Sequence, residues 1–194
     1  MIVAVLLAAY LLGSIPTGVL LARSAGIDPR RAGSGNIGAT NVARTAGGRL
    51  GFFTLVGDAL KGVLAVAVAH AASDAAWAPA AAGLAAILGH LWSVFLRFQG
   101  GKGVATALGV FLVLSPLAIL VSVLAFAITA RTFRYVSLAS MVAAVTLALA
   151  CLLTVSSPSV RVAAVVTSIL ILIRHRDNIG RLRAGTEPRF GASA

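Results

Sequence analysis

The sequence contains few charged residues and very few acidic ones. Only 11% of its 194 residues are charged, against about 25% in an average soluble domain, and 59% are hydrophobic, with a mean hydropathy of +1.00. A soluble chain of this size could not bury so much apolar surface, so the composition predicts a chain that resides in a lipid bilayer. The five acidic residues are scattered, so we expect neither a metal site nor a cofactor.

The sequence also has a single cysteine and no basic stripe with interleaved aromatic residues. Cys151 lies in an apolar run, which excludes a disulfide framework and predicts a small core residue. The net charge is +11, but the basic residues lie between apolar runs, so we expect no nucleic-acid partner. Two interpretations of the charge remain: attraction to anionic lipid headgroups, and a site for a phosphorylated substrate.

Long apolar runs divide the chain into predicted membrane spans. The first run lacks the basic start and short apolar core of a cleavable signal peptide. We predict spans over residues 2–22, 52–72, 76–96, 135–155 and 160–173, the last beginning a little earlier. Residues 104–130 form either one long helix or two short ones broken at Ser115-Pro116, because proline ends or kinks a helix at the residue before it.

The distribution of basic residues favours the broken arrangement. With a turn at Ser115-Pro116 the chain crosses the membrane seven times, and all 16 basic residues except Arg161 lie on or near one side. One long helix would instead place Arg131, Arg134 and the C-terminal tail on the other side. The positive-inside rule makes the basic side cytoplasmic. We therefore predict an all-α integral membrane protein, one domain over residues 1–194, with seven transmembrane helices, the N-terminus outside and the C-terminus cytoplasmic.

Two glycine-containing stretches have structural or functional interpretations. In "GSIPTG" (residues 13–18), Pro16 frees a backbone carbonyl and the neighbours are small, which indicates either close helix packing around a kink or a thinned wall beside a site. In "GGKG", Gly100, Gly101 and Gly103 expose amide groups beside Lys102 ahead of a helix starting near Val104. That combination suits an anion such as phosphate, although a flexible basic turn has the same composition and the P-loop spacing is absent.

The polar loop "SGNIGATNVARTAGG" (residues 34–48) supplies similar groups. Glycines expose backbone, hydroxyls and amides suit a polyol, and Arg44 can hold a phosphate with two hydrogen bonds. A turn with helix caps is the alternative interpretation. The groups that we expect to bind substrate here are Ser34, Gly35, Asn36, Gly38, Thr40, Asn41 and Arg44.

The remaining polar candidates are few. His175 and Asn178 follow the last span, where His175 is either a proton acceptor or an interfacial histidine. Asp58 and Lys61 lie within a span, so we expect them to face the helix bundle as an i,i+3 pair, with structural pairing and a role in the site equally open. His90 is a further buried candidate, and His70 is expected at the outer interface.

Four stretches together resemble a known family, the bacterial acyl-phosphate:glycerol-3-phosphate acyltransferases. They are "SGNIGATNVAR", "DALKG", "GHLWSVFLRFQGGKGVAT" and "HRDNIGRLRAGTE", in this order. The resemblance implies seven spans with these motifs on the cytoplasmic side of the cell membrane. It implies transfer of a fatty acyl group from acyl phosphate to the 1-hydroxyl of glycerol 3-phosphate, which yields lysophosphatidic acid and phosphate. Ser93 stands where the family usually has proline, so the local helix end is expected to differ.

The resemblance and the residue chemistry together assign roles. We expect one phosphate to be held by the "GGKG" segment with Ser34 and the other by Arg44, His175 and Asn178, or the reverse, with the acyl chain in a groove beside Gly13 and Gly18. The proton acceptor is either His175 or the donor's own phosphate. The predicted catalytic residues are His175, Asn178, Lys102, Arg44 and Ser34; the predicted substrate-binding residues are Gly35, Asn36, Gly38, Thr40, Asn41, Lys61, His90, Gly100, Gly101, Gly103, Thr106 and Glu187.

Two other classes of function fit part of the pattern. A transporter of phosphorylated solutes would carry the same charges and glycines, but such proteins usually show internal repeats and midplane sites, and no repeat is visible here. A non-catalytic lipid-binding membrane protein is the second. Both lack an acyl-transfer reaction, so phosphate release from acyl phosphate separates them from an enzyme.

Overall fold

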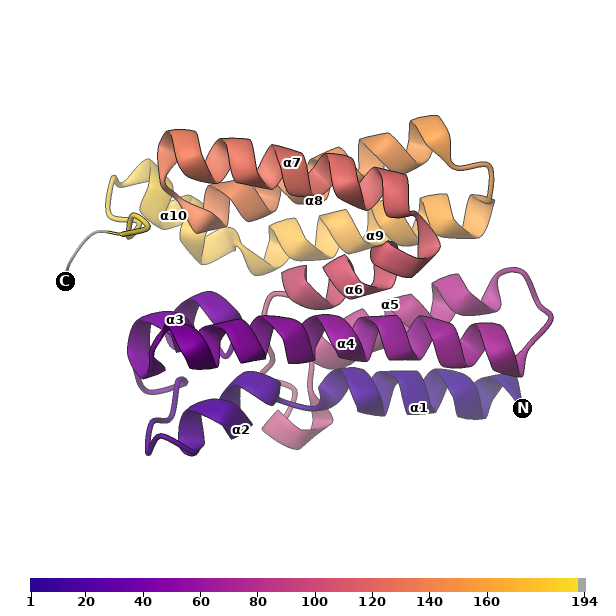
Figure 1. The fold of residues 1–194 in the computed structure, drawn as a ribbon, viewed down its shortest axis with the longest axis horizontal. Coiled ribbons are helices and arrows are strands. Elements are labelled where there is room, and N and C mark those ends of the chain that lie inside the picture. The colour runs from indigo at the N-terminus through magenta and orange to yellow at the C-terminus, as the bar shows by residue number, and fades with distance from the viewer. Residues whose placement is uncertain (192–194) are drawn as a thin grey trace. The chain divides into compact units, whose positions relative to one another are not determined.

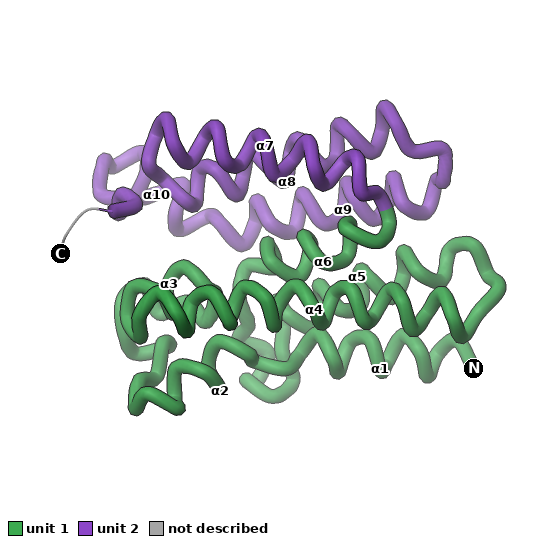
Figure 2. The backbone as a smooth tube through the Cα atoms, in the orientation of Figure 1, with its two compact units in different colours: residues 1–114 green, residues 115–194 purple. Residues whose placement is uncertain are grey.

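The computed structural model describes residues 1–191, and these form helices and connecting loops with no β-strand (Figure 1). The chain divides into two compact units, residues 1–114 and the segment from Ser115 onward (Figure 2). The predicted all-α class is confirmed for the described residues. In chain order the elements are α1 (Ile2–Ser14), α2 (Thr17–Arg23), α3 (Ala39–Ala46), α4 (Gly48–Ala72), α5 (Ala78–Leu91), the 3-10 turn η1 (Val94–Leu96), α6 (Val104–Leu114), α7 (Pro116–Phe133), α8 (Val136–Thr154), α9 (Pro158–Arg174) and α10 (Arg176–Arg183).

Unit 1 packs α1, α5 and α6 around α4 through small residues. A methyl group added at Gly13 would lie 2.0 Å from the carbonyl oxygen of Ala86, and one at Gly109 would lie 1.9 Å from that of Ala59. The backbones therefore approach as closely as glycine allows, which is how apolar helices associate in lipid. Ala9, Ala65, Ala69, Ala82 and Ala86 form an alanine-rich core between the helices.

The predicted kink in the first span is confirmed as a full break between α1 and α2 at Ile15-Pro16. Gly18 lies against the carbonyl oxygen of Ile37, and a methyl group there would be only 1.9 Å away. The space beside Gly13 and Gly18 is thus filled by the chain's own backbone. The close-packing interpretation is confirmed at these two glycines, and the acyl-chain groove beside them stays a prediction.

In unit 2, α7 packs on α8 and α8 packs on α9, and the short helix α10 follows α9. The hydroxyl of Ser168 on α9 donates to the carbonyl oxygen of Ala144 on α8. After α9 the chain bends by 54° into α10. The tail returns to the turn between α7 and α8, where Arg134 donates to the carbonyl oxygen of Phe190 at 3.1 and 3.2 Å.

The described helices include five long and apolar enough to cross a membrane, or six if the bent pair α9–α10 counts as one span. The predicted break at Ser115-Pro116 is confirmed, since α6 ends at Leu114 and α7 begins at Pro116. The last span begins at Pro158, earlier than residue 160, as expected. With 11 residues, α6 is about 16 Å long, which is shorter than the hydrocarbon core of a bilayer. Seven complete crossings therefore remain a prediction, as do their orientation and the single domain.

Candidate active site

The "GGKG" segment is a fixed loop attached to the end of α5. The amide groups of Gly100 and Gly101 donate to the carbonyl oxygens of Leu91 and His90 at 3.1 and 3.0 Å. Gly103 has a φ of +83°, which glycine adopts without strain, and α6 begins at the next residue as predicted. Lys102 is therefore held directly before a helix N-terminus, where backbone amides and the helix dipole favour an anion.

The opening polar segment is part loop and part helix, because residues from Ala39 onward form α3. The prediction of a loop over residues 34–48 is therefore correct only for its first part. Val42 is fully buried and anchors α3, while Thr40 and Arg44 are exposed. Ser34, on the loop before α3, is also exposed. The hydroxyl and guanidinium groups assigned to substrate thus lie on the surface of this segment.

Asn41 uses its side-chain amide within the segment. Its nitrogen donates to the carbonyl oxygens of Pro29 at 2.9 Å, Ala32 at 3.0 Å and Asn36 at 2.7 Å. Its oxygen accepts from the amide group of Ser34 at 2.9 Å. The side chain is buried, and its hydrogen bonds fix the loop backbone at Ser34 and Asn36.

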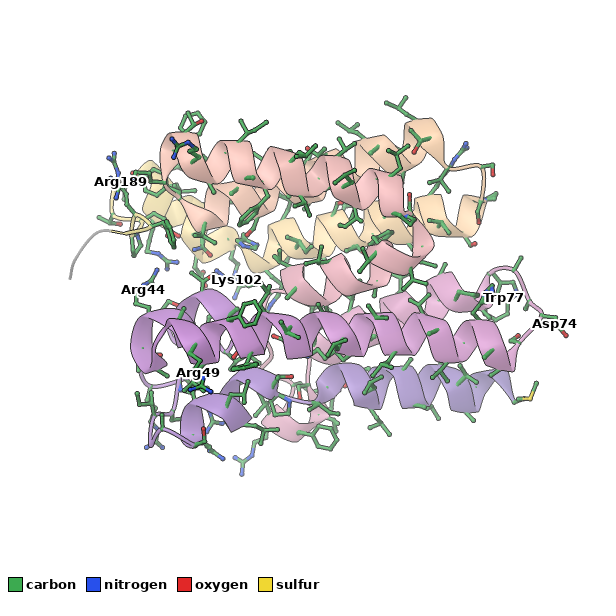
Figure 3. The ribbon with its side chains drawn as sticks, in the orientation of Figure 1. Arg44, Arg49, Asp74, Trp77, Lys102 and Arg189 are labelled. Atoms are coloured by element: carbon green, nitrogen blue, oxygen red, sulfur yellow. The ribbon has the colours of Figure 1, made fainter. Side chains whose placement is uncertain are left out.

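Two of the three predicted phosphate-binding segments belong to unit 1. Figure 3 shows Lys102 in the half of this unit that carries Arg44 and Arg49, whereas Asp74 and Trp77 lie at its opposite end. Positive charge is therefore concentrated at one end of unit 1. This agrees with the asymmetry of basic residues in the sequence.

Asp58, Lys61 and His90 form a buried cluster of polar side chains in unit 1. The Nζ atom of Lys61 is 2.9 Å from the Oδ1 atom of Asp58, and the Nδ1 atom of His90 is 3.7 Å from the same oxygen. Lys61 also donates to the carbonyl oxygen of Ile15 at 3.1 Å, at the break between α1 and α2. The predicted i,i+3 pair and its inward orientation are confirmed. Thr106, on α6, is buried as well.

The third segment belongs to unit 2. His175 occupies the bend between α9 and α10 and is 2% exposed. Its Nδ1 atom lies 2.8 Å from the carbonyl oxygen of Ile171. A carbonyl oxygen only accepts, so Nδ1 carries the hydrogen, and Nε2 of the neutral ring is an acceptor. This is the tautomer that a general base requires.

Asn178 and Glu187 form a clamp that joins α10 to the tail. The amide nitrogen of Asn178 donates to Oε1 of Glu187 at 2.6 Å, and Nε of Arg181 donates to Oε2 at 2.8 Å. Burial raises the pKa of Glu187, but the hydrogen bonds from Asn178 and Arg181 outweigh it and leave the pKa below the ordinary glutamate value. The carboxylate thus fixes the Asn178 side chain, a contact that the sequence did not predict.

Three further contacts were missed in the sequence. The hydroxyl of Ser93 donates to the carbonyl oxygen of Ser14 at 2.5 Å, and that of Tyr10 donates to the carbonyl oxygen of Trp92 at 2.7 Å. Both tie the end of α5 to the first span, and the serine in the usual proline position was the only signal. In the turn after α2, Arg30 donates hydrogen bonds to the carboxylate of Asp28 and so fixes the turn. The same hydrogen bonds hold the pKa of Asp28 well below its usual range. In the described part of the chain, no group of three or more His, Cys, Asp or Glu residues could hold a metal ion.

The apolar helices, with buried polar and cationic groups near their ends, are those of a multi-pass, all-helical membrane protein. Residues 3–185 match the family model described as glycerol-3-phosphate acyltransferase. The chain belongs to the glycerol-3-phosphate acyltransferase family and is an acyltransferase.

Relatives and solved structures extend this match over almost the whole chain. Glycerol-3-phosphate acyltransferases from Geotalea daltonii and Trichlorobacter lovleyi are 51% and 52% identical to it, over 97% and 95% of both chains. The crystal structure of PlsY (YgiH), an integral membrane glycerol 3-phosphate acyltransferase, in its glycerol 3-phosphate form is 42% identical with a TM-score of 0.94, covering 98% of this chain and 96% of that one. Its lysophosphatidic acid form matches with a TM-score of 0.90, covering 98% and 95%.

Proposed function

We propose that the protein transfers a fatty acyl group from acyl phosphate to the 1-hydroxyl of glycerol 3-phosphate, releasing lysophosphatidic acid and phosphate. The observation that carries the proposal is the similarity to a protein whose solved forms include glycerol 3-phosphate and lysophosphatidic acid, an acceptor and the matching product. Acyl phosphate as donor rests on the sequence resemblance. An activated donor such as acyl phosphate also suits this chain, because its polar segments carry cations and glycine amides rather than a nucleophile with an adjacent base.

The reaction needs few groups because acyl phosphate is already an activated mixed anhydride. The acceptor hydroxyl oxygen attacks the acyl carbonyl carbon, the bond from that carbon to the phosphate oxygen breaks, and inorganic phosphate leaves. The hydroxyl proton passes either to Nε2 of His175 or to the departing phosphate. Positioning and stabilisation of the carbonyl oxyanion then supply most of the acceleration.

The binding roles follow from charge and hydrogen-bonding chemistry. Lys102 and the amides before α6 suit one phosphate, together with Ser34, while Arg44 suits the other through its two parallel N–H groups. Asn178, fixed by Glu187, presents an amide beside the bend at His175. The proposal places the reaction on the cytoplasmic side of the cell membrane, where a lipid-soluble donor meets a water-soluble acceptor.

The decisive experiment is phosphate release from acyl phosphate by the purified full chain in liposomes. We expect release that depends on glycerol 3-phosphate, with equimolar formation of lysophosphatidic acid. Lys102→Ala should reduce kcat/KM by about 10² or more, since it removes a charge that faces a phosphoryl group. Arg49→Ala is the matched control, because Arg49 is an exposed cation at the same end of unit 1 that contacts the Phe53 ring, and its activity should stay near wild type. Solute uptake without phosphate release would indicate a transporter instead.

The proposed topology has its own test. In a Cys151→Ser background, Ser156→Cys lies in the turn before α9 and Ala184→Cys follows α10. A membrane-impermeant thiol reagent applied to intact cells should label position 156 and spare position 184. Labelling of position 184 from outside would place the tail away from the cytoplasm and overturn the proposed site.

A further inference from the structure

His90 lies where three elements of the phosphate-binding half of unit 1 meet. It is on α5, its ring faces Asp58 on α4, and the loop that carries Lys102 passes over its other edge. The Nδ1 atom is 3.7 Å from Oδ1 of Asp58. A methyl group added at Gly101 would lie 2.3 Å from Nε2 of His90, so the glycine backbone rests directly against that ring nitrogen.

The backbone of His90 supports the same loop. Its carbonyl oxygen accepts from the amide group of Gly101 at 3.0 Å, and the carbonyl oxygen of the next residue, Leu91, accepts from Gly100 at 3.1 Å. One residue therefore contacts the loop through both its carbonyl group and its ring. His90 is 4% exposed, so the ring has little freedom to move aside.

The opposite side of the ring is fixed in turn. Asp58 is held by Lys61 at 2.9 Å, and Lys61 also donates to the carbonyl oxygen of Ile15. Both charged side chains are buried, and a buried ion pair with an additional hydrogen bond is costly to rearrange. The ring of His90 thus lies between a buried ion pair and the Gly100–Gly103 loop.

We propose that His90 is a positioning residue whose imidazole, set by Asp58, holds the Gly100–Gly103 loop and so places Lys102 for phosphate binding. This inference rests on the proposed function for the identity of the phosphate. It assigns His90 and Lys61 to the support of the loop rather than to contact with substrate. The contact that matters is the one between Nε2 and Gly101.

Two substitutions separate the two edges of the ring. Asparagine places its amide nitrogen near the position of Nδ1 and leaves the space beside Gly101 empty, whereas glutamine reaches the position of Nε2. We expect His90→Asn to raise the KM for one of the two phosphorylated substrates by about tenfold, the effect of weakening one hydrogen bond to a charged group. His90→Gln should stay within about twofold of wild type. The substrate whose KM rises identifies the phosphate that the loop holds.

The controls distinguish positioning from a structural role. Melting midpoints in detergent should be alike for the two variants, and His70→Gln, a substitution at an exposed histidine near the far end of α4, should change nothing. If His90→Asn does not fold, Gly101→Ala tests the same contact from the loop side and should give the same KM rise. A fall in kcat with unchanged KM, or equal KM values for His90→Asn and His90→Gln, overturns the proposal.

Failure of the proposed function would be visible separately. If the wild-type chain releases no phosphate from acyl phosphate, the acyl-transfer reaction is wrong. The Kd of inorganic phosphate and of glycerol 3-phosphate, measured on His90→Asn and His90→Gln, still tests the positioning role. A weaker Kd confined to the asparagine variant supports it, and equal values for both variants reject it.

Discussion

The Nζ atom of Lys61 lies 2.9 Å from Oδ1 of Asp58, one turn earlier on α4, and both side chains are almost completely buried. A second hydrogen bond from Lys61 reaches the carbonyl oxygen of Ile15. That carbonyl lies at the break between α1 and α2, next to Pro16. The pair therefore joins α4 to the interrupted first span, and each charge depends on the other because neither has water to replace its partner.

Lys61→Met should destabilise the protein strongly. The substitution leaves the Asp58 carboxylate buried without its ion-pair partner, which typically costs about 3–5 kcal/mol. Unfolding in denaturant, in detergent micelles, measures the loss. The double variant Asp58→Asn/Lys61→Met should recover much of it, since no isolated charge remains. Asp177→Ala is the control, because it removes an exposed ion pair with Arg176 and should cost less than about 1 kcal/mol.

Asn41→Asp should loosen the loop before α3. A carboxylate cannot donate to the carbonyl oxygens of Pro29, Ala32 and Asn36, although it retains an acceptor for the amide of Ser34. We expect faster hydrogen exchange across residues 30–41 and faster tryptic cleavage after Arg30 and Arg31. Thr40→Ala, at an exposed neighbouring position, should leave both rates unchanged. Unchanged exchange in Asn41→Asp would show that the loop is held by other contacts.

Ionisation of Glu187 should make the stability of the fold depend on pH in the acidic range. Its pKa is lower in the folded protein than in the unfolded chain, so its ionised form stabilises the fold above the unfolded pKa of about 4.3. That contribution is lost as pH falls through the folded pKa. The melting midpoint of wild type should therefore exceed that of Glu187→Gln at pH 7, and the difference should shrink below about pH 4. A constant difference across this range would contradict the role of the ionised clamp.

Gly13→Ala should weaken the packing of α1 on α5. The added methyl group would lie 2.0 Å from the carbonyl oxygen of Ala86, which is backbone and cannot rotate away. Overpacking of this kind costs about 1–3 kcal/mol. Gly180→Ala is the matched control, since Gly180 lies within α10 with no neighbour within 4 Å of the added carbon. That change should be neutral or stabilise by about 0.5–1 kcal/mol through helix propensity, as measured by thermal unfolding.

Much of the fold could be predicted because its causes are local. The break at Ser115-Pro116 follows from the missing amide hydrogen of proline, and the start of α6 at Val104 follows from the glycines before it. The polar segment was harder to interpret. Its asparagines and glycines indicated a loop, but Val42 is buried and stabilises α3 through tertiary packing, which overrides weak helix propensity.

The sequence by itself determined that this is an all-helical membrane protein and where proline interrupts its helices, and it predicted which glycine and cationic segments would hold phosphate. Those properties depend on composition and on neighbours along the chain. Only the tertiary structure decided what each polar side chain contacts. Asn41 hydrogen-bonds to the backbone of the loop before α3, Glu187 fixes Asn178, and the ring of His90 lies between Asp58 and Gly101. These partners come from different segments, so only the packing of helices and loops, and the need to satisfy buried polar groups, brings them together.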